Sequence, residues 1–128
     1  MYMDVKESKI LVRARLEGKR YSVIEDALID TGAALTVIPP VTSDLLELET
    51  NKPHQKVRLV TASGLIEVPI NILDKLEVAG IEVEKLPVAV HKIPDPAPIK
   101  ILLGMNFIER IKLKVDGKKG TFDIEDPF

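Results

Sequence analysis

Short alternating segments separated by turn residues constrain the fold of this 128-residue chain more than any other feature of its sequence. From Lys9 to Leu16, the residues on one side of the alternation are all apolar, which is the two-residue period of a half-buried strand. Similar segments recur about every 8 to 12 residues, separated by turns such as Glu17–Lys19, Ala79–Gly80 and Asp116–Gly117. This spacing, with little helix, predicts an all-β, barrel-like fold.

The expected strands span residues 9–16, 20–29, 35–38, 101–103 and three hairpins over residues 56–72, 75–90 and 112–124. One or two short helices complete the pattern. We expect Thr42 or Ser43 to cap a helical turn or two that runs through Leu48. Residues 106–111 fit a second short helix, and residues 1–8 are expected to form a loose arm or an edge strand.

The composition indicates one soluble globular domain over residues 1–128, with 45% hydrophobic and 30% charged residues. A net charge of −2 gives no reason to expect nucleic acid or a membrane surface as a partner. No apolar run approaches the ~20 residues of a membrane span, and Met1–Ser8 lacks the apolar core of a signal peptide. We therefore expect a cytoplasmic location. With no cysteine, the chain has no disulfide, thiolate metal site or cysteine nucleophile.

The segment Ala27–Ala33 carries the most chemical information. An apolar strand delivers Asp30 into a turn that continues with Thr31 and Gly32. Glycine permits a tight turn and the close approach of another chain. A carboxylate at the edge of a core is partly desolvated, which makes it useful for chemistry. By itself, however, Asp-Thr-Gly is also an ordinary turn tripeptide.

A second motif follows about seventy residues later in the sequence. Residues 101–104 read Ile-Leu-Leu-Gly and precede a helix-like stretch. An apolar Asp-Thr-Gly-Ala strand turn, a Gly-tipped hairpin and then apolar-apolar-Gly before a short helix resemble the retropepsin-like, or retroviral-type, aspartic proteases. The resemblance covers about residues 9–124. It implies a single-domain acid-protease barrel that is active as a twofold homodimer.

The resemblance also assigns roles to individual residues. Asp30 would be the catalytic carboxylate, Thr31 would reach across the twofold axis, and Gly32 would present its backbone to a bound peptide. The residues that would contact substrate are Leu28, Ala33, Val37 and Leu102 in the cleft and Ala62, Ser63 and Gly64 at the tip of a flap. Simple core packing is the alternative role for the apolar members of this set.

Peptide hydrolysis by aspartates needs two carboxylates that share one proton and hold one water. Two carboxylates about 4 Å apart repel by roughly 4 kcal/mol at an effective dielectric of 20, which keeps such a pair singly protonated over a broad pH range. The chain has no second Asp-Thr/Ser-Gly, so the second carboxylate must come from another copy of the chain. The predicted function is an aspartic endopeptidase that acts as a homodimer on peptide or protein substrates. A catalytically idle peptide-binding or scaffold dimer with the same fold is the alternative.

Two positions depart from the viral pattern. Viral retropepsins usually pair an acidic residue, two after the glycine, with an arginine after the second glycine. Here these positions are Ala34 and Met105, so both partners of the pair are missing together.

The C-terminal hairpin, with Phe122 and Ile124 on one side, is our candidate for part of the dimer interface.

Other chemistries lack the residues they need. The only histidines, His54 and His91, have no metal-ligand spacing around them, and we expect no metal and no organic cofactor. Ser63 lacks the strand and helix setting of a serine nucleophile.

Overall fold

The computed structural model describes residues 2–6, 9–50, 56–61, 64–93 and 99–126. Over these residues the chain forms mostly strands, with two short helices. The strands are β1 (Tyr2–Lys6), β2 (Lys9–Glu17), β3 (Ser22–Ile29), β4 (Thr36–Ile38), β5 (Glu49–Thr50), β6 (Lys56–Thr61), β7 (Gly64–Val78), β8 (Ile81–Val90), β9 (Ile101–Leu103), β10 (Lys112–Asp116) and β11 (Thr121–Glu125). The helices are α1 (Pro40–Leu45) and α2 (Met105–Ile108).

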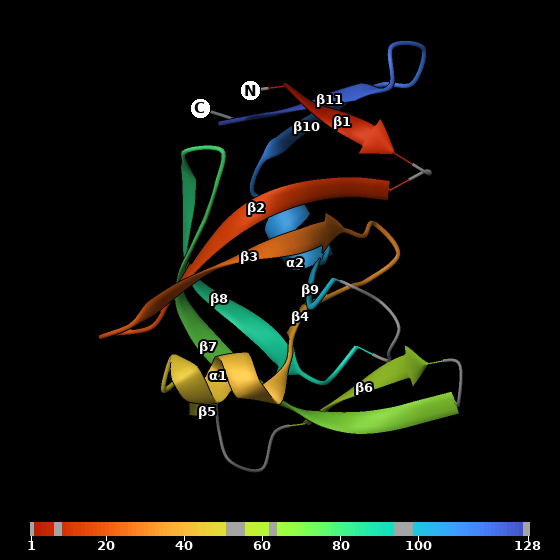
Figure 1. Cartoon of the computed structure of the whole chain (residues 1–128). Coiled ribbons are helices and arrows are strands. Elements are labelled where there is room, and N and C mark those ends of the chain that lie inside the picture. The colour runs from red at the N-terminus through yellow and green to blue at the C-terminus, as the bar shows by residue number, and fades with distance from the viewer. Residues whose placement is uncertain (1, 7–8, 51–55, 62–63, 94–98, 127–128) are drawn as a thin grey trace.

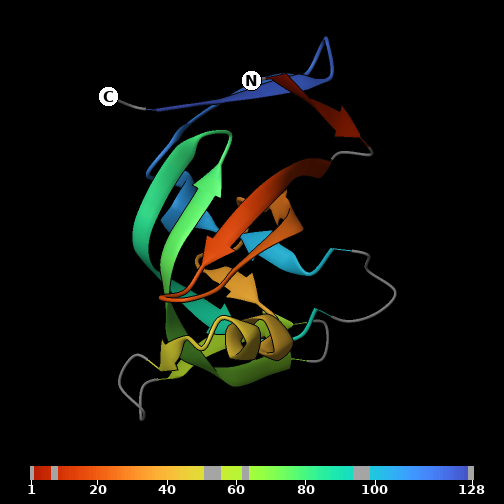
Figure 2. The ribbon, with the colours of Figure 1, turned by 60° about the vertical axis from the view of Figure 1, so that its left-hand side comes forward.

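Six of these strands close into a barrel (Figures 1 and 2). The order around it is β2, β3, β9, β4, β8 and β7, and β7 pairs with β2 to close the ring. Strand β9 lies parallel to β3 and antiparallel to β4, although it follows them by more than sixty residues in the sequence. The predicted all-β barrel with one or two short helices is confirmed. The insertion of β9 between β3 and β4 brings the two sequence motifs onto neighbouring strands.

Two extensions flank the barrel. Strands β1, β11 and β10 form a sheet beyond one end of it, and β6 with the first half of β7 forms a hairpin at the other end (Figure 1). The sequence pattern predicted two separate hairpins over residues 56–72 and 75–90. Instead, β7 runs unbroken for 15 residues and serves both hairpins. Strand β7 thus joins the wall of the barrel directly to the hairpin that extends from it.

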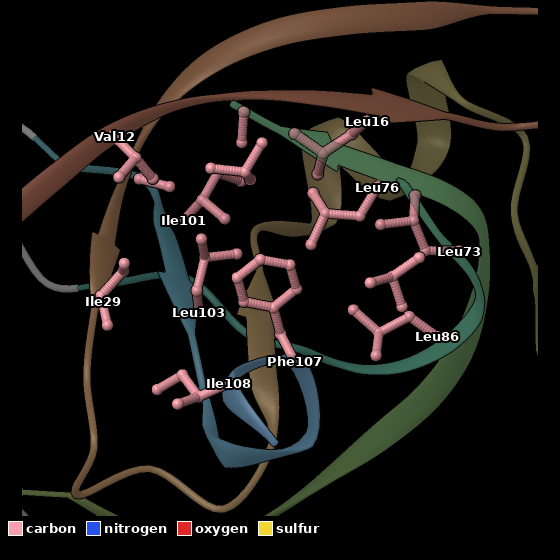
Figure 3. Close-up of a cluster of buried hydrophobic side chains, with 14 of the residues drawn as sticks. Val12, Leu16, Ile29, Leu73, Leu76, Leu86, Ile101, Leu103, Phe107 and Ile108 are labelled. Carbon is pink, nitrogen blue, oxygen red and sulfur yellow. The ribbon is translucent and has the colours of Figure 1, made fainter. Parts of the chain in front are cut away.

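The barrel interior holds the main hydrophobic core. Its side chains come from alternate positions of the barrel strands, and the ring of Phe107 projects among them from α2 (Figure 3). Phe107 is completely buried and lies beside Leu103 of β9. Burial of large apolar side chains is the dominant favourable contribution to folding. These contacts hold α2 against the barrel strand β9, so the second motif is fixed in place.

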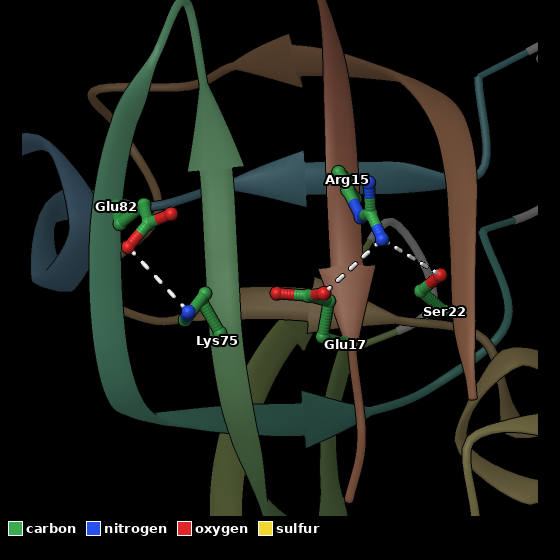
Figure 4. A network of polar contacts seen from close by, with 5 residues as sticks. All are labelled: Arg15, Glu17, Ser22, Lys75 and Glu82. Carbon is green, nitrogen blue, oxygen red and sulfur yellow. Dashed lines mark hydrogen bonds and ion pairs between the residues drawn. The ribbon is translucent and has the colours of Figure 1, made fainter. Parts of the chain in front are cut away.

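The outer face of the barrel is largely charged away from its open end. Arg15 lies 3.3 Å from Glu17 and 3.5 Å from the hydroxyl of Ser22, and Lys75 lies 3.4 Å from Glu82 (Figure 4). Exposed ion pairs of this kind contribute little to stability, typically about 0.2–1 kcal/mol each. These charged side chains make the outer surfaces of β2, β7 and β8 polar.

The predicted start of the first helix is wrong. Thr42 and Ser43 do not cap it but lie buried inside α1, which begins at Pro40 and ends at Leu45 rather than Leu48. Proline suits the first helical position because its fixed φ matches the helix and its missing N–H would have no partner there. The hydroxyl of Ser43 is used instead to anchor α1 on β7, where it accepts a 2.6 Å hydrogen bond from Nδ2 of Asn71.

The C-terminal hairpin buries its apolar side within the same chain. Phe122 and Ile124 are 1% and 3% exposed and belong to the main core. These two side chains are therefore not available to a partner in this structure. Among the described strands, β11 pairs with β10 on one side and β1 on the other, so the outer edge of β10 is the edge of this sheet.

Candidate active site

The Asp30 carboxylate sits where two parallel strands end together. Asp30 follows β3 directly, and its backbone nitrogen donates a 2.9 Å hydrogen bond to the carbonyl oxygen of Leu103, the last residue of β9. Side chains alternate along a strand, so Asp30 points to the same side as Leu28, away from the barrel core that Ile29 joins. The fold thus presents a half-buried carboxylate at the open end of the barrel.

The turn after Asp30 folds back on the carboxylate. The backbone nitrogen of Gly32 donates to Oδ1 of Asp30 over 2.9 Å, and the nitrogen of Ala33 donates to the Asp30 carbonyl oxygen over 3.2 Å. A Cβ atom on Gly32 would lie 3.2 Å from the same Oδ1, which is a tight contact. Glycine therefore gives the backbone N–H unobstructed access to the carboxylate. Both Thr31 and Gly32 are exposed.

The second motif depends on Gly104 for a different reason. A Cβ atom there would lie 2.4 Å from the carbonyl oxygen of Leu35 and 2.9 Å from that of Ala33, closer than atoms can pack. This close approach lets the backbone nitrogen of Met105 donate to the Ala33 oxygen over 2.7 Å. The start of α2 therefore fixes the segment that follows the Asp-Thr-Gly turn.

Asn106 extends this connection with its side chain. Its Oδ1 accepts from the backbone nitrogen and the hydroxyl of Thr36, each over 2.9 Å, and its Nδ2 donates to the Pro87 carbonyl oxygen over 2.7 Å. The Thr36 hydroxyl in turn accepts from the nitrogen of Gly104 over 3.2 Å. Sequence analysis missed both residues. An Asn at the start of a helix and a Thr at the start of a strand are too common to reveal this pairing.

Three of the predicted cleft residues meet on neighbouring strands. Leu28 lies opposite Leu102 across β3 and β9, and Leu102 lies opposite Val37 across β9 and β4. Val37 is buried at 5% exposure, whereas Leu28 and Leu102 are half-buried. Val37 and Leu102 pack in a small second cluster, separate from the barrel core, that includes Val68 of β7.

This second cluster joins the β6–β7 hairpin to the end of the barrel. Its other members are Val57, Ile66, Leu35 and Ala89. Val57 and Val68 lie opposite each other in the hairpin, and Val68 is 4% exposed. The hairpin that sequence analysis predicts as a flap therefore packs against the strands that carry Val37 and Leu102. These side chains can therefore pack in a core, line a cleft, or do both.

The remaining predicted site residues occupy different places. Gly64 begins β7, is exposed and has φ +113°, a conformation that favours glycine. Ala62 and Ser63, the other two predicted flap-tip residues, lie outside the described residues. Ala33 is half-buried and lines an open depression of about 430 Å³ beside Thr31 and Gly32. Ala34, Met105 and Glu109 line the same depression, so both positions that depart from the viral pattern lie at its surface.

The described residues contain no group of three or more His, Asp or Glu side chains that could hold a metal ion. Across the part of the chain that the structure describes, neither helix is long and apolar enough to cross a membrane.

The fold and a family model define the class of the protein. A crystal structure of a retropepsin-like aspartic protease from Rickettsia conorii matches this chain with a TM-score of 0.66 and 20% identity, over 95% of this chain and 86% of that one. The fold is therefore that of the retropepsin-like proteases. A family model described as aspartyl protease matches residues 12–107, and the chain belongs to this aspartyl protease family. No curated protein sequence matches the chain significantly.

Proposed function

We propose that this chain is an aspartic endopeptidase that works as a twofold homodimer, with Asp30 of each protomer supplying one of two catalytic carboxylates. The observation that carries the proposal is the Asp30–Gly32 turn in a member of the aspartyl protease family. The chain supplies one such turn, and its Thr31 and Gly32 are exposed. A second copy of the turn could therefore approach it about a twofold axis.

In this dimer, the two Asp30 carboxyls share one proton and hold a water between them. The water oxygen attacks the peptide carbonyl carbon while the ionised carboxylate takes a proton from the water. The protonated carboxyl gives its proton to the carbonyl oxygen. When the tetrahedral gem-diol intermediate collapses, the carbon–nitrogen bond breaks and the carboxyl that took the water proton gives it to the leaving amine. The other, ionised carboxylate accepts a proton from one gem-diol hydroxyl, which restores the singly protonated pair. No metal or organic cofactor enters these steps.

The Gly32 N–H contributes to the position of this carboxylate. A hydrogen bond donated by a backbone N–H to a carboxylate oxygen restricts the orientation of the side chain. Correct placement of reacting groups accounts for a large part of enzymatic rate acceleration. The rigid connection from β9 through Gly104 to Ala33 keeps the whole turn in place for the same purpose.

The substrate would be an extended peptide that lies between the β6–β7 hairpin and the strand ends. Extended peptides bind in this manner through main-chain hydrogen bonds, while apolar pockets select the side chains. Leu28 and Leu102 are half-buried at this surface, so a bound peptide can cover the exposed part of each side chain. The hairpin, which packs on Val37 and Leu102 without substrate, must lift to admit the peptide.

The test compares two carboxylate-to-amide changes on the same strand segment. Asp30→Asn should abolish cleavage of a proteome-derived peptide library while sedimentation still shows a dimer. Asp26→Asn is the matched control, because Asp26 lies on the exposed side of β3 and its 3.9 Å contact with Arg13 is solvent-exposed. Cleavage at the wild-type rate by Asp30→Asn would refute the mechanism. A wild-type protein that binds peptides but leaves them intact would instead support the idle peptide-binding dimer.

A further inference from the structure

A row of apolar side chains crosses the outer surface of the barrel at the end that carries Asp30. Leu11 lies opposite Leu28 across β2 and β3, Leu28 lies opposite Leu102 across β9, and Leu102 lies opposite Val37 on β4. Residues opposite each other on paired strands point to the same face of the sheet. We call these four side chains the apolar stripe.

The exposure of the apolar stripe increases from one end to the other. Val37 is 5% exposed beneath the β6–β7 hairpin, Leu102 and Leu28 are half-buried, and Leu11 is 38% exposed. Among the described residues, the second cluster includes Val37 and Leu102 but neither Leu28 nor Leu11. The Leu11 end of the stripe is therefore open to a ligand that lies on the same face as Asp30.

The stripe also has a definite boundary along the β2–β3 hairpin. The next residues on the same face are Arg13 and Asp26, which lie opposite each other and approach within 3.9 Å. Beyond them, Arg15 lies opposite Ile24. The outer face of this hairpin thus changes from an apolar pair to charged residues within two positions of Leu11.

We propose that Leu11 forms an outer apolar subsite of the peptide cleft, so that the enzyme selects substrates with an apolar side chain away from the scissile bond. The proposal rests on the proposed protease function and deepens it. Neighbouring strands lie about 4.8 Å apart and strand residues about 3.3 Å apart, so Leu11 lies roughly 8 Å from Asp30 along the sheet surface. An extended peptide covers that distance in two to three residues. The selected side chain is therefore two or three residues from the cleaved bond.

The experiment uses synthetic peptides with one fixed apolar cleavage site and Leu, Glu or Lys at each of the three positions on either side. For the wild-type protein, kcat/KM should be about tenfold higher with Leu than with Lys at one outer position, the typical discrimination of a small apolar pocket. Leu11→Lys should abolish this preference and favour Glu there. Leu11→Ala should weaken the preference without reversing it.

Ile24→Lys is the matched control. Ile24 is an exposed apolar residue on the same face of the β2–β3 hairpin, but it lies beyond the charged boundary of the stripe. This variant should retain the wild-type preference. Unchanged selectivity in Leu11→Lys would overturn the subsite. So would a sedimentation result in which Leu11→Lys dissociates the dimer, because Leu11 would then be a subunit contact.

A binding measurement separates this proposal from the proposed catalysis. The same peptides are titrated onto the Asp30→Asn protein. Peptides with Leu at the outer position should bind more tightly than peptides with Lys there. The added Leu11→Lys change should remove that difference. If the wild-type protein cleaves nothing while this binding pattern holds, the protease proposal fails and the subsite stands. If cleavage occurs and neither measurement depends on Leu11, the subsite fails and the protease stands. If no peptide is cleaved or bound, both fail.

Discussion

Oδ1 of Asn106 accepts two hydrogen bonds from Thr36, one from its backbone nitrogen and one from its hydroxyl, each 2.9 Å long. The two residues are seventy positions apart in the sequence, one at the start of α2 and the other at the start of β4. Thr36 is completely buried and Asn106 is half-buried, so water has little access to the Thr36 donors. They close the connection between the segment after Asp30 and the helix after the second motif.

Asn106→Ala should therefore lower the free energy of unfolding by about 2–4 kcal/mol, because it leaves the Thr36 donors and the Pro87 oxygen without their partner. Chemical denaturation of the two proteins measures the difference. Glu109→Ala is a suitable control, since Glu109 is exposed just beyond the same helix and its removal should change stability by no more than about 0.5 kcal/mol. Equal stability of Asn106→Ala and the wild type would show that the network is unimportant.

Gly104→Ala should lower the free energy of unfolding more than Asn106→Ala does. Its Cβ would lie 2.4 Å from the Leu35 carbonyl oxygen, and because that atom is backbone, relief requires the strand or the helix to move. We expect a loss of at least about 3 kcal/mol in unfolding free energy, or failure to fold. Thermal unfolding provides the comparison with Gly117→Ala, where an added Cβ meets nothing within 4 Å. Similar melting temperatures for the two variants would contradict the packing argument.

Much of the fold could be predicted because it depends on local patterns. The alternation in residues 9–16 and the apolar run before Asp30 each identify a strand without tertiary information, and β2 and β3 confirm both. The placement of β9 between β3 and β4 could be inferred only through the family resemblance. Parallel pairing between distant segments leaves no local sequence signal.

Other features could not be predicted because tertiary contacts determine them. Ser43 has the side chain of a helix cap, but its hydroxyl bonds to Asn71 on another strand, and Pro40 begins the helix instead. The alternation of Phe122 and Ile124 was correct for a strand. It could not show that their partner is the core of the same chain rather than a second chain. For the catalytic assignment, the sequence predicts Asp30 and, because it has a single Asp-Thr-Gly, a second carboxylate from another copy of the chain.

Replacement of Gly64 should affect turnover more than folding. Gly64 has φ +113° at the start of β7, and an added Cβ would meet no atom within 4 Å, so the cost of Gly64→Val is local backbone strain rather than a clash. If this hairpin covers the substrate, the strain should reduce kcat/KM by more than tenfold while the protein still folds, with a melting temperature lower by only several degrees. Hydrogen exchange should slow across Val57–Val68 when a tight peptide-like inhibitor binds. Unchanged exchange in this hairpin would show that it is not a flap.

The proposed pairing of two Asp30 carboxyls predicts how activity and dimerisation depend on pH. At low pH both acids are protonated and no base remains to accept the proton from water; at high pH both are ionised and no acid remains for the carbonyl oxygen. A plot of kcat/KM against pH should therefore be bell-shaped. Like charges repel when both acids are ionised, so the dimer of the wild-type protein should also weaken as pH rises.

Asp30→Asn removes this repulsion and should make the dimer dissociation constant independent of pH over the same range, as sedimentation can measure. Asp26→Asn should retain the pH dependence of the wild type, because its carboxylate lies on the exposed face of β3. Thr31→Ala should weaken the dimer at every pH, since it removes a hydroxyl at the exposed turn rather than a charge. If the wild-type and Asp30→Asn dimers respond identically to pH, the two Asp30 carboxyls do not meet, and the active site must be assembled in another way.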